Sequence, residues 1–324
     1  MSVFRTIVQV KPLPQAISTN SKLYFTGSCF AENIAEKVAA NRLPVLSNPF
    51  GIIYNPLSIA KTLEYHISDI PLNNEQLQFY NERYFHFDFH SKMAHPDQEI
   101  ALKHIQEARD NGKTFLQQTT HLVITFGTAF AYFHKSSGLP VANNHKLPST
   151  DFDKKLLSVE TIVTSWLNII QQLKSFNNKL IVIFTISPVR HWRDGAVENN
   201  VSKSVLMQSV QQLVQQIVDT YYFPAYEIMM DELRDYRFYA EDMLHPNATA
   251  IQYIWDKFSE ACVDERGRIC FKQMAELNAA IAHKPFFETS FQHQQFKKNM
   301  LEKSLSLQQI YPELDLSDAV GYFN

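Results

Sequence analysis

Five short apolar runs, each followed by a segment of helical periodicity, constrain the fold of this chain more than any other feature. The runs occupy residues 22–26, 42–46, 121–126, 179–186 and 225–230. Each run is flat and apolar, which is typical of parallel strands that are covered on both faces. Strand and helix alternating five times predict a doubly wound α/β fold, with a five-stranded parallel sheet and helices on both faces.

The helices between these runs are predicted from apolar residues that recur every three to four positions. They cover residues 31–41, 57–67, 98–118, 158–175, 200–220 and 247–262. After about residue 265 the pattern changes to two amphipathic helices, roughly 268–283 and 290–309, separated near Pro285. We therefore predict an α/β domain over 1–265 and a C-terminal helical extension over 266–324.

One segment of the first domain, residues 66–96, departs from the strand and helix alternation. Its YFHFDFH string alternates with period two, which predicts an inserted strand or hairpin between the second and third core strands. His86, Asp88 and His90 would then share one strand face, with His95 nearby, which raises the alternative of a metal site. The flanking phenylalanines already explain such a strand by burial, so we expect no metal here.

Composition narrows the function further. A hydrophobic content of 45% supports a large core, and the net charge of −3 is spread without a basic stripe, so no nucleic-acid partner is expected. Cys29, Cys262 and Cys270 are too few for a disulfide framework or zinc cage, which fits a reducing compartment. The opening MSVFRTIVQVKPLPQ lacks an apolar signal core and no later run approaches a membrane span, so we expect a cytoplasmic protein without membrane partners.

The first chemically suggestive segment directly follows the first strand. Gly27 permits a tight strand-to-helix turn, and Ser28 then lies at a helix N-terminus, where backbone N–H groups stabilise an oxyanion. Ser28 is therefore the candidate nucleophile. The alternatives are an ordinary N-cap serine and a thiol nucleophile at the adjacent Cys29.

The second such segment is Asp242-Met243-Leu244-His245, which precedes the helix predicted from residue 247. An aspartate three residues before a histidine can hold the imidazole in one tautomer while the other ring nitrogen faces a nucleophile. In a parallel sheet the turns after the first and fifth strands share one edge. We therefore expect Ser28, Asp242 and His245 to form a catalytic triad.

The Gly-Ser-Cys-Phe-Ala string at 27–31 resembles the GSCFA family, a branch of the SGNH/GDSL hydrolase superfamily. Further matching strings lie at 48–56, 126–129, 187–191, 193–195 and 242–246. The resemblance implies a flavodoxin-like sheet, a nucleophile at Ser28 and the Asp242/His245 pair. It also implies that the backbone N–H of Gly51 joins that of Ser28 in the oxyanion hole.

The third matching block departs from the superfamily, because Gly127-Thr128-Ala129-Phe130 stands where Gly-x-Asn-Asp is usual. The expected asparagine donor to the oxyanion is therefore absent. Thr128, or Asn143 or Asn144 in the nearby VANNHK string, could replace it. Loss of one such donor costs about a hundredfold to a thousandfold in rate.

The stretch after the fourth strand places Arg190 and His191 on the same edge, where a guanidinium suits a substrate carboxylate or phosphate. The alternative is a loop held by Arg193/Asp194 pairing and a helix capped by Asn199. From these residues we predict a serine esterase or acyltransferase without a cofactor, acting on a small or carbohydrate-linked ester. A binding protein that has lost catalysis is the alternative, and neither the acyl group nor the oligomeric state follows from the sequence.

Overall fold

A five-stranded parallel sheet forms the centre of the protein. The computed structural model describes residues 5–324, so the first four residues of the N-terminal string discussed above lie outside it. The strands, in the spatial order β10-β9-β5-β1-β2, are Thr220–Phe223, Ile181–Ile186, His121–Phe126, Leu23–Gly27 and Val45–Ser47. Every neighbouring pair is parallel, which confirms the predicted doubly wound sheet.

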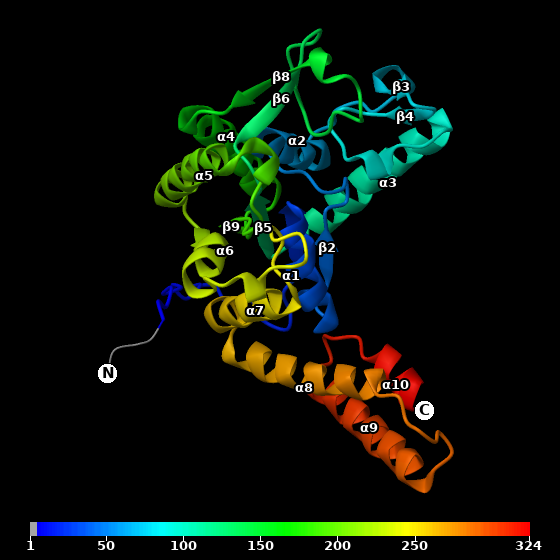
Figure 1. Ribbon diagram of the computed structural model, residues 1–324. Coiled ribbons are helices and arrows are strands. Elements are labelled where there is room, and N and C mark those ends of the chain that lie inside the picture. Colours follow the sequence, from blue (N-terminus) through cyan, green and yellow to red (C-terminus); the bar gives the residue numbers. More distant parts are fainter. Residues whose placement is uncertain (1–4) are drawn as a thin grey trace.

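Helices cover both faces of this sheet (Figure 1). On one face, α1 (Cys29–Ala40) and α7 (Ala248–Cys262) pack on strand residues such as Phe25 and Val123. On the other, α2 (Pro56–Ile67), α4 (Val159–Phe176) and α5 (Ala196–Gln216) pack on strand residues such as Tyr24 and Phe184. Because successive side chains of a strand point to opposite faces, strands between two helical layers must be apolar at nearly every position.

The prediction that residues 225–230 form the fifth strand is wrong. This segment forms a short helix, α6 (Ala225–Glu227), followed by π-helical Ile228–Glu232, and the strand is the preceding Thr220–Phe223. The apolar residues of 225–230 are buried as helical residues, except that Met230 is partly buried, and a short buried run does not distinguish helix from strand. The true strand is less apolar because it lies at the edge of the sheet.

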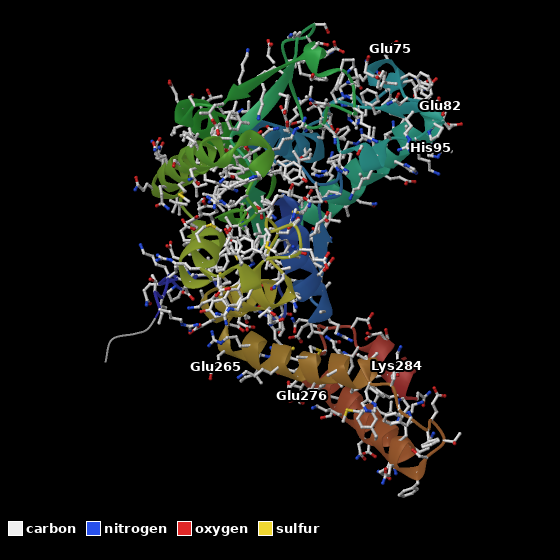
Figure 2. The ribbon with its side chains drawn as sticks, in the orientation of Figure 1. Glu75, Glu82, His95, Glu265, Glu276 and Lys284 are labelled. Atoms are coloured by element: carbon white, nitrogen blue, oxygen red, sulfur yellow. The ribbon has the colours of Figure 1, made fainter. Side chains whose placement is uncertain are left out.

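The insert forms a hairpin of β3 (Gln78–Tyr80) and β4 (Arg83–Phe85), followed by α3 (Gln98–Leu116). Asn81 and Glu82 both have positive φ, as in the two-residue turns that match strand twist. Because β4 ends at Phe85, residues 86–90 leave the strand and the expected shared face of His86, Asp88 and His90 does not form. No group of three His, Cys, Asp or Glu side chains within residues 5–324 could hold a metal ion. In Figure 2, His95 lies with Glu82 at the outer end of the insert.

A second sheet, not predicted from the sequence, follows β5. It is antiparallel and consists of β7 (Pro140–Val141), β6 (Phe130–His134) and β8 (Phe152–Leu156). Single helical turns complete the connections at Asn74–Gln76, Ser91–Met93, Ser149–Asp151, Trp192–Asp194 and Tyr236–Phe238.

The C-terminal residues form α8 (Glu265–Ala282), α9 (Phe291–Ile310) and the unpredicted α10 (Ser317–Phe323). The α8–α9 pair projects from the body, and Glu265 and Glu276 mark α8 along its length (Figures 1 and 2). The Phe271 ring of α8 stacks on Trp255 of α7, with 5.7 Å between ring centroids, so one core cluster continues into the extension. No helix among the described residues is long and apolar enough to cross a membrane.

Candidate active site

The turn from β1 to α1 depends on a glycine. Gly27 has a φ of +124°, and a Cβ atom at this position would lie 2.1 Å from the carbonyl oxygen of Thr125. The Gly27 N–H donates to the Asn48 side chain at 2.9 Å. Only glycine fits such a turn, which places Ser28 at the N-cap and Cys29 at the first position of α1.

Ser28, the nucleophile expected from the sequence, is almost completely buried, at 1% exposure. Its hydroxyl makes no capping hydrogen bond and has no partner among the described residues. Its N–H donates to the carbonyl of Thr125 at 3.1 Å, which continues the sheet ladder. In this structure the Ser28 hydroxyl therefore makes no hydrogen bond to His245.

Cys29, the next residue, is partly exposed. Burial and the charge of Glu32 raise the pKa of the Cys29 thiol, whereas three groups lower it: the backbone N–H groups of Phe30 and Cys29, and the charge of Lys203. The two N–H groups belong to the first turn of α1, where no preceding turn supplies carbonyl acceptors. These N–H groups favour the ionised thiol, whereas the Ser28 hydroxyl makes no hydrogen bond to the helix N-terminus.

Asp242 and His245 form the expected pair. Asp242 accepts from His245 Nδ1 at 2.5 Å, and its other oxygen accepts from the backbone N–H groups of His245 and Leu244 at 2.9 Å each. These three hydrogen bonds, that from the His245 backbone first, lower the pKa of Asp242 to about 2. Both side chains are about half exposed, and no described residue hydrogen-bonds His245 Nε2. The loop itself thus orients the imidazole with Nε2 available to a nucleophile.

Lys203 is a site residue that the sequence analysis missed. It is buried on α5, and its ammonium donates to the carbonyls of Gly127 and Ser187 at 2.8 Å each, at the carboxyl ends of β5 and β9. Burial lowers the pKa of Lys203 to about 7, and the charge of Cys29 acts in the opposite direction. The sequence could have indicated this residue, because Lys203 is a charged residue on the same helical face as the buried Leu206 and Val210.

The expected oxyanion donors are occupied within the protein. Gly51, with a φ of +90°, donates its N–H to the Asn48 carbonyl at 2.8 Å. The Gly127 N–H donates to the Tyr54 carbonyl at 2.9 Å. The Thr128 hydroxyl is 3.0 Å from the Ser202 hydroxyl. The N–H groups of Gly51 and Gly127 are therefore not free to bind a substrate oxygen in this structure.

The two asparagines considered as replacement donors lie on the side of the insert. Asn143 lines a cavity of about 470 Å³ with Tyr80 and Arg83 of the β3–β4 hairpin. Its side chain accepts the N–H of His145, and the carbonyl of Asn144 accepts that of Leu147. The structure does not bring either residue together with Ser28 or Cys29.

Arg190 and His191 lie beside the Asp242/His245 pair. Arg190 lines a cavity of about 360 Å³ together with Asp242, Trp192 and Tyr236. The His191 ring meets Tyr54 edge-on at 5.3 Å, and burial first, then the charge of Lys203, lowers the pKa of His191 to about 4. The charge of His245 also acts on His191, which places both histidines in one region.

The sequence also allowed a loop held by Arg193/Asp194 pairing and by Asn199 as a helix cap, and the structure shows neither interaction. Asp194 pairs with Lys154 rather than with Arg193. Asn199 does not cap α5; its side chain accepts the His191 N–H at 2.9 Å and so fixes the loop.

The parallel sheet and the Asp242/His245 pair describe an α/β protein with one histidine oriented by a carboxylate. The chain belongs to the GSCFA family: the model of that family matches residues 22–258, and the model described as the C-terminal domain of GSCFA domain proteins matches residues 274–324.

Solved structures similar to this chain include a carbohydrate esterase of family 3 from Talaromyces cellulolyticus, at 9% identity and a TM-score of 0.35, covering 79% of this chain and 99% of that one. An acetyl xylan esterase from the rumen bacterium Butyrivibrio proteoclasticus is similar at 11% identity and a TM-score of 0.38, covering 79% and 66%. No curated protein sequence matches the chain.

Proposed function

We propose that this protein is an esterase or acyltransferase that forms a covalent acyl-enzyme at the Ser28–Cys29 turn, with His245 as general base. The observation that carries the proposal is the 2.5 Å hydrogen bond between Asp242 and His245 Nδ1, which leaves His245 Nε2 without a partner among the described residues. A histidine held by a carboxylate at one nitrogen, with the other nitrogen free, is the arrangement that nucleophile activation requires.

In the proposed mechanism, His245 takes the proton of the nucleophile as that group attacks an ester carbonyl. The carbonyl oxygen becomes an oxyanion, which the N–H groups of Cys29 and Phe30 stabilise at the N-terminus of α1. Collapse of this intermediate expels the alkoxide, which takes the proton from His245. Water or an acceptor hydroxyl then gives its proton to His245 and attacks the acyl group, and His245 returns that proton to the nucleophile as the acyl group is released.

The cavity beside the Asp242/His245 pair suits a polar or carbohydrate-linked substrate. Trp192 and Tyr236 line it and are 53% and 76% exposed, so their rings can stack on a sugar face. Arg190 and Arg234 line the same cavity and can bind a carboxylate or phosphate.

The experiment is a comparison of acetate release from p-nitrophenyl acetate and from O-acetylated sugars, with and without an alcohol acceptor. Turnover that stops when His245 is replaced would support the proposal, and acyl transfer to the acceptor would separate transferase from hydrolase. The occupied N–H groups of Ser28 and Gly51 favour a second candidate, a ligand-binding protein without turnover. That candidate predicts sugar binding by calorimetry and no acetate release.

Replacing Arg190 by alanine tests the cavity. We expect KM for the negatively charged mono-p-nitrophenyl succinate to rise about tenfold while KM for neutral p-nitrophenyl acetate stays nearly constant, because one charge-assisted hydrogen bond is lost. Arg193→Ala, an exposed neighbour that does not line the cavity, is the matched control. Equal changes for both esters would rule out a recognition role for Arg190.

A further inference from the structure

We propose that Cys29, and not Ser28, is the nucleophile of this site, so that the acyl-enzyme is a thioester. This inference rests on the proposed function and specifies its chemistry. Four observations carry it: the exposure of the two side chains, the direction of the helix N-terminus, the surroundings of Lys203 and the contrast with the other cysteines.

Exposure separates the two neighbours. The Ser28 hydroxyl is buried without a hydrogen-bond partner, whereas Cys29 is partly exposed. Attack by Ser28 would require its side chain to leave the interior, and its N–H is already committed to Thr125. Adjacent residues at a strand-to-helix turn point in different directions, so only one of them can face a base in the open part of the site.

The backbone around Cys29 suits a reacting thiol. The N–H groups of Cys29 and Phe30 open α1 and have no backbone acceptor among the described residues, and they lower the pKa of the Cys29 thiol. An oxygen of a bound ester carbonyl would meet the same donors. Ser28 is the N-cap, but its hydroxyl makes no capping hydrogen bond to the N–H groups of α1.

The second, independent observation is the buried cation of Lys203. Its ammonium contacts two carbonyl oxygens and, among the described residues, no carboxylate. A buried positive charge without a counter-ion is costly unless a negative charge forms beside it. Gly27 of β1 pairs with Thr125 of β5, two residues before the Gly127 carbonyl that Lys203 binds, so the ammonium lies beside the turn that carries Cys29. A thiolate at Cys29 would therefore supply that charge.

The resting thiol still needs a base. Burial and Glu32 together raise the pKa of Cys29 above its ordinary value despite Lys203 and the helix N-terminus. The proton therefore leaves to His245 during attack: the C–S bond forms, the carbonyl oxygen becomes an oxyanion, and the alkoxide departs with that proton. Hydrolysis of the thioester restores the thiol, and no oxidant or reductant is needed.

The other cysteines lack these features. Cys262 and Cys270 are buried in the apolar core, and burial raises the pKa of Cys262 to about 12 and that of Cys270 to about 11. They are therefore matched controls for any thiol-specific result.

The test combines acylation with mutagenesis. The full-length protein is incubated with p-nitrophenyl acetate, quenched in acid and digested, and acetylated peptides are identified by mass spectrometry. We expect an acetyl group on Cys29 and none on Ser28, Cys262 or Cys270. Cys29→Ala should lower kcat by about a thousandfold or more, and Ser28→Ala by less than about tenfold. Cys29→Ser should retain measurable turnover that depends on His245 but resists iodoacetamide.

Each alternative outcome has a distinct meaning. Acetyl on Ser28, with activity lost in Ser28→Ala and kept in Cys29→Ala, would overturn the thiol assignment and leave the esterase proposal intact. Turnover that requires His245 but neither residue of the turn would also overturn it. Wild-type protein that neither turns over nor acquires an acetyl group would refute the proposed function and this inference together. Melting temperatures of the variants exclude unfolding as the cause of lost activity.

Discussion

Replacing His245 by alanine is expected to lower kcat for p-nitrophenyl acetate by about a thousandfold or more while changing KM little. The reason is that the imidazole acts on the proton of the nucleophile, a role realised in the transition state rather than in substrate binding. Steady-state kinetics of the purified variant give both constants. His283→Ala, an exposed histidine at the end of α8, is the matched control and should keep the wild-type rate.

The partner carboxylate refines this prediction. Asp242→Asn should lose activity while retaining the loop, because an amide side chain favours the wrong imidazole tautomer. The lowered pKa of Asp242, about 2, means that this carboxylate stays ionised as pH falls towards that value. An acid loss of activity above about pH 3 must then come from another group. A His245→Ala protein with the wild-type rate would remove the basis of the proposed function.

Replacing Lys203 by methionine is expected to change both activity and the pH dependence of stability. Methionine fills a similar volume but leaves the carbonyls of Gly127 and Ser187 without their donor. It also removes the positive charge that lowers the thiol pKa of Cys29. His245 still takes the thiol proton in this variant, but the transition state loses the positive charge beside the forming anion, so we expect the rate to fall about tenfold or more.

The stability effect has a defined sign. The folded pKa of Lys203, about 7, lies below its ordinary value of 10.5, so the unfolded chain holds more protons than the folded chain between those values. The free energy of unfolding therefore rises with pH across that window because of Lys203, and below it the penalty of burying the charge is present in full. In urea unfolding at pH 6, 8 and 10, Lys203→Met should lack this rise.

A surface lysine serves as the control. Lys174 also donates to a backbone carbonyl, that of Val218, but lies at an accessible position, so Lys174→Met should keep the wild-type pH dependence. An equal rise of the free energy of unfolding with pH in Lys203→Met and in wild type, between pH 7 and 10, would contradict this assignment. In that case Lys203 is not the group that loses its proton on folding in that pH range.

The error at the fifth strand shows where sequence patterns are insufficient. AYEIMM is apolar because both core clusters receive its side chains, and burial alone does not indicate whether a backbone is extended or helical. The strand Thr220–Phe223 pairs on one side only, with β9, and can therefore carry polar residues. The position of this strand in the sheet therefore depends on its hydrogen bonds to β9 and not on its own apolar pattern.

Local interactions explain what the sequence by itself determined about this protein. The period of apolar residues predicted the parallel sheet and its helices, since each element must bury one face or both. The pairing of Asp242 with His245 was likewise predictable, because all three of its hydrogen bonds lie within four consecutive residues. The tight turn at Gly27 was also predictable, because glycine lacks a Cβ atom and can adopt backbone conformations that other residues avoid.

Only the tertiary structure decided which side chain of the Ser28–Cys29 turn is accessible and what surrounds it. Burial of Ser28 depends on β5, whose Thr125 carbonyl takes the Ser28 N–H. The charge near Cys29 depends on Lys203, which α5 carries to the carboxyl ends of two other strands. Such contacts join residues distant in the chain, and their energies depend on how all the elements pack, because exclusion of water makes an unpaired hydroxyl or an uncompensated ammonium costly.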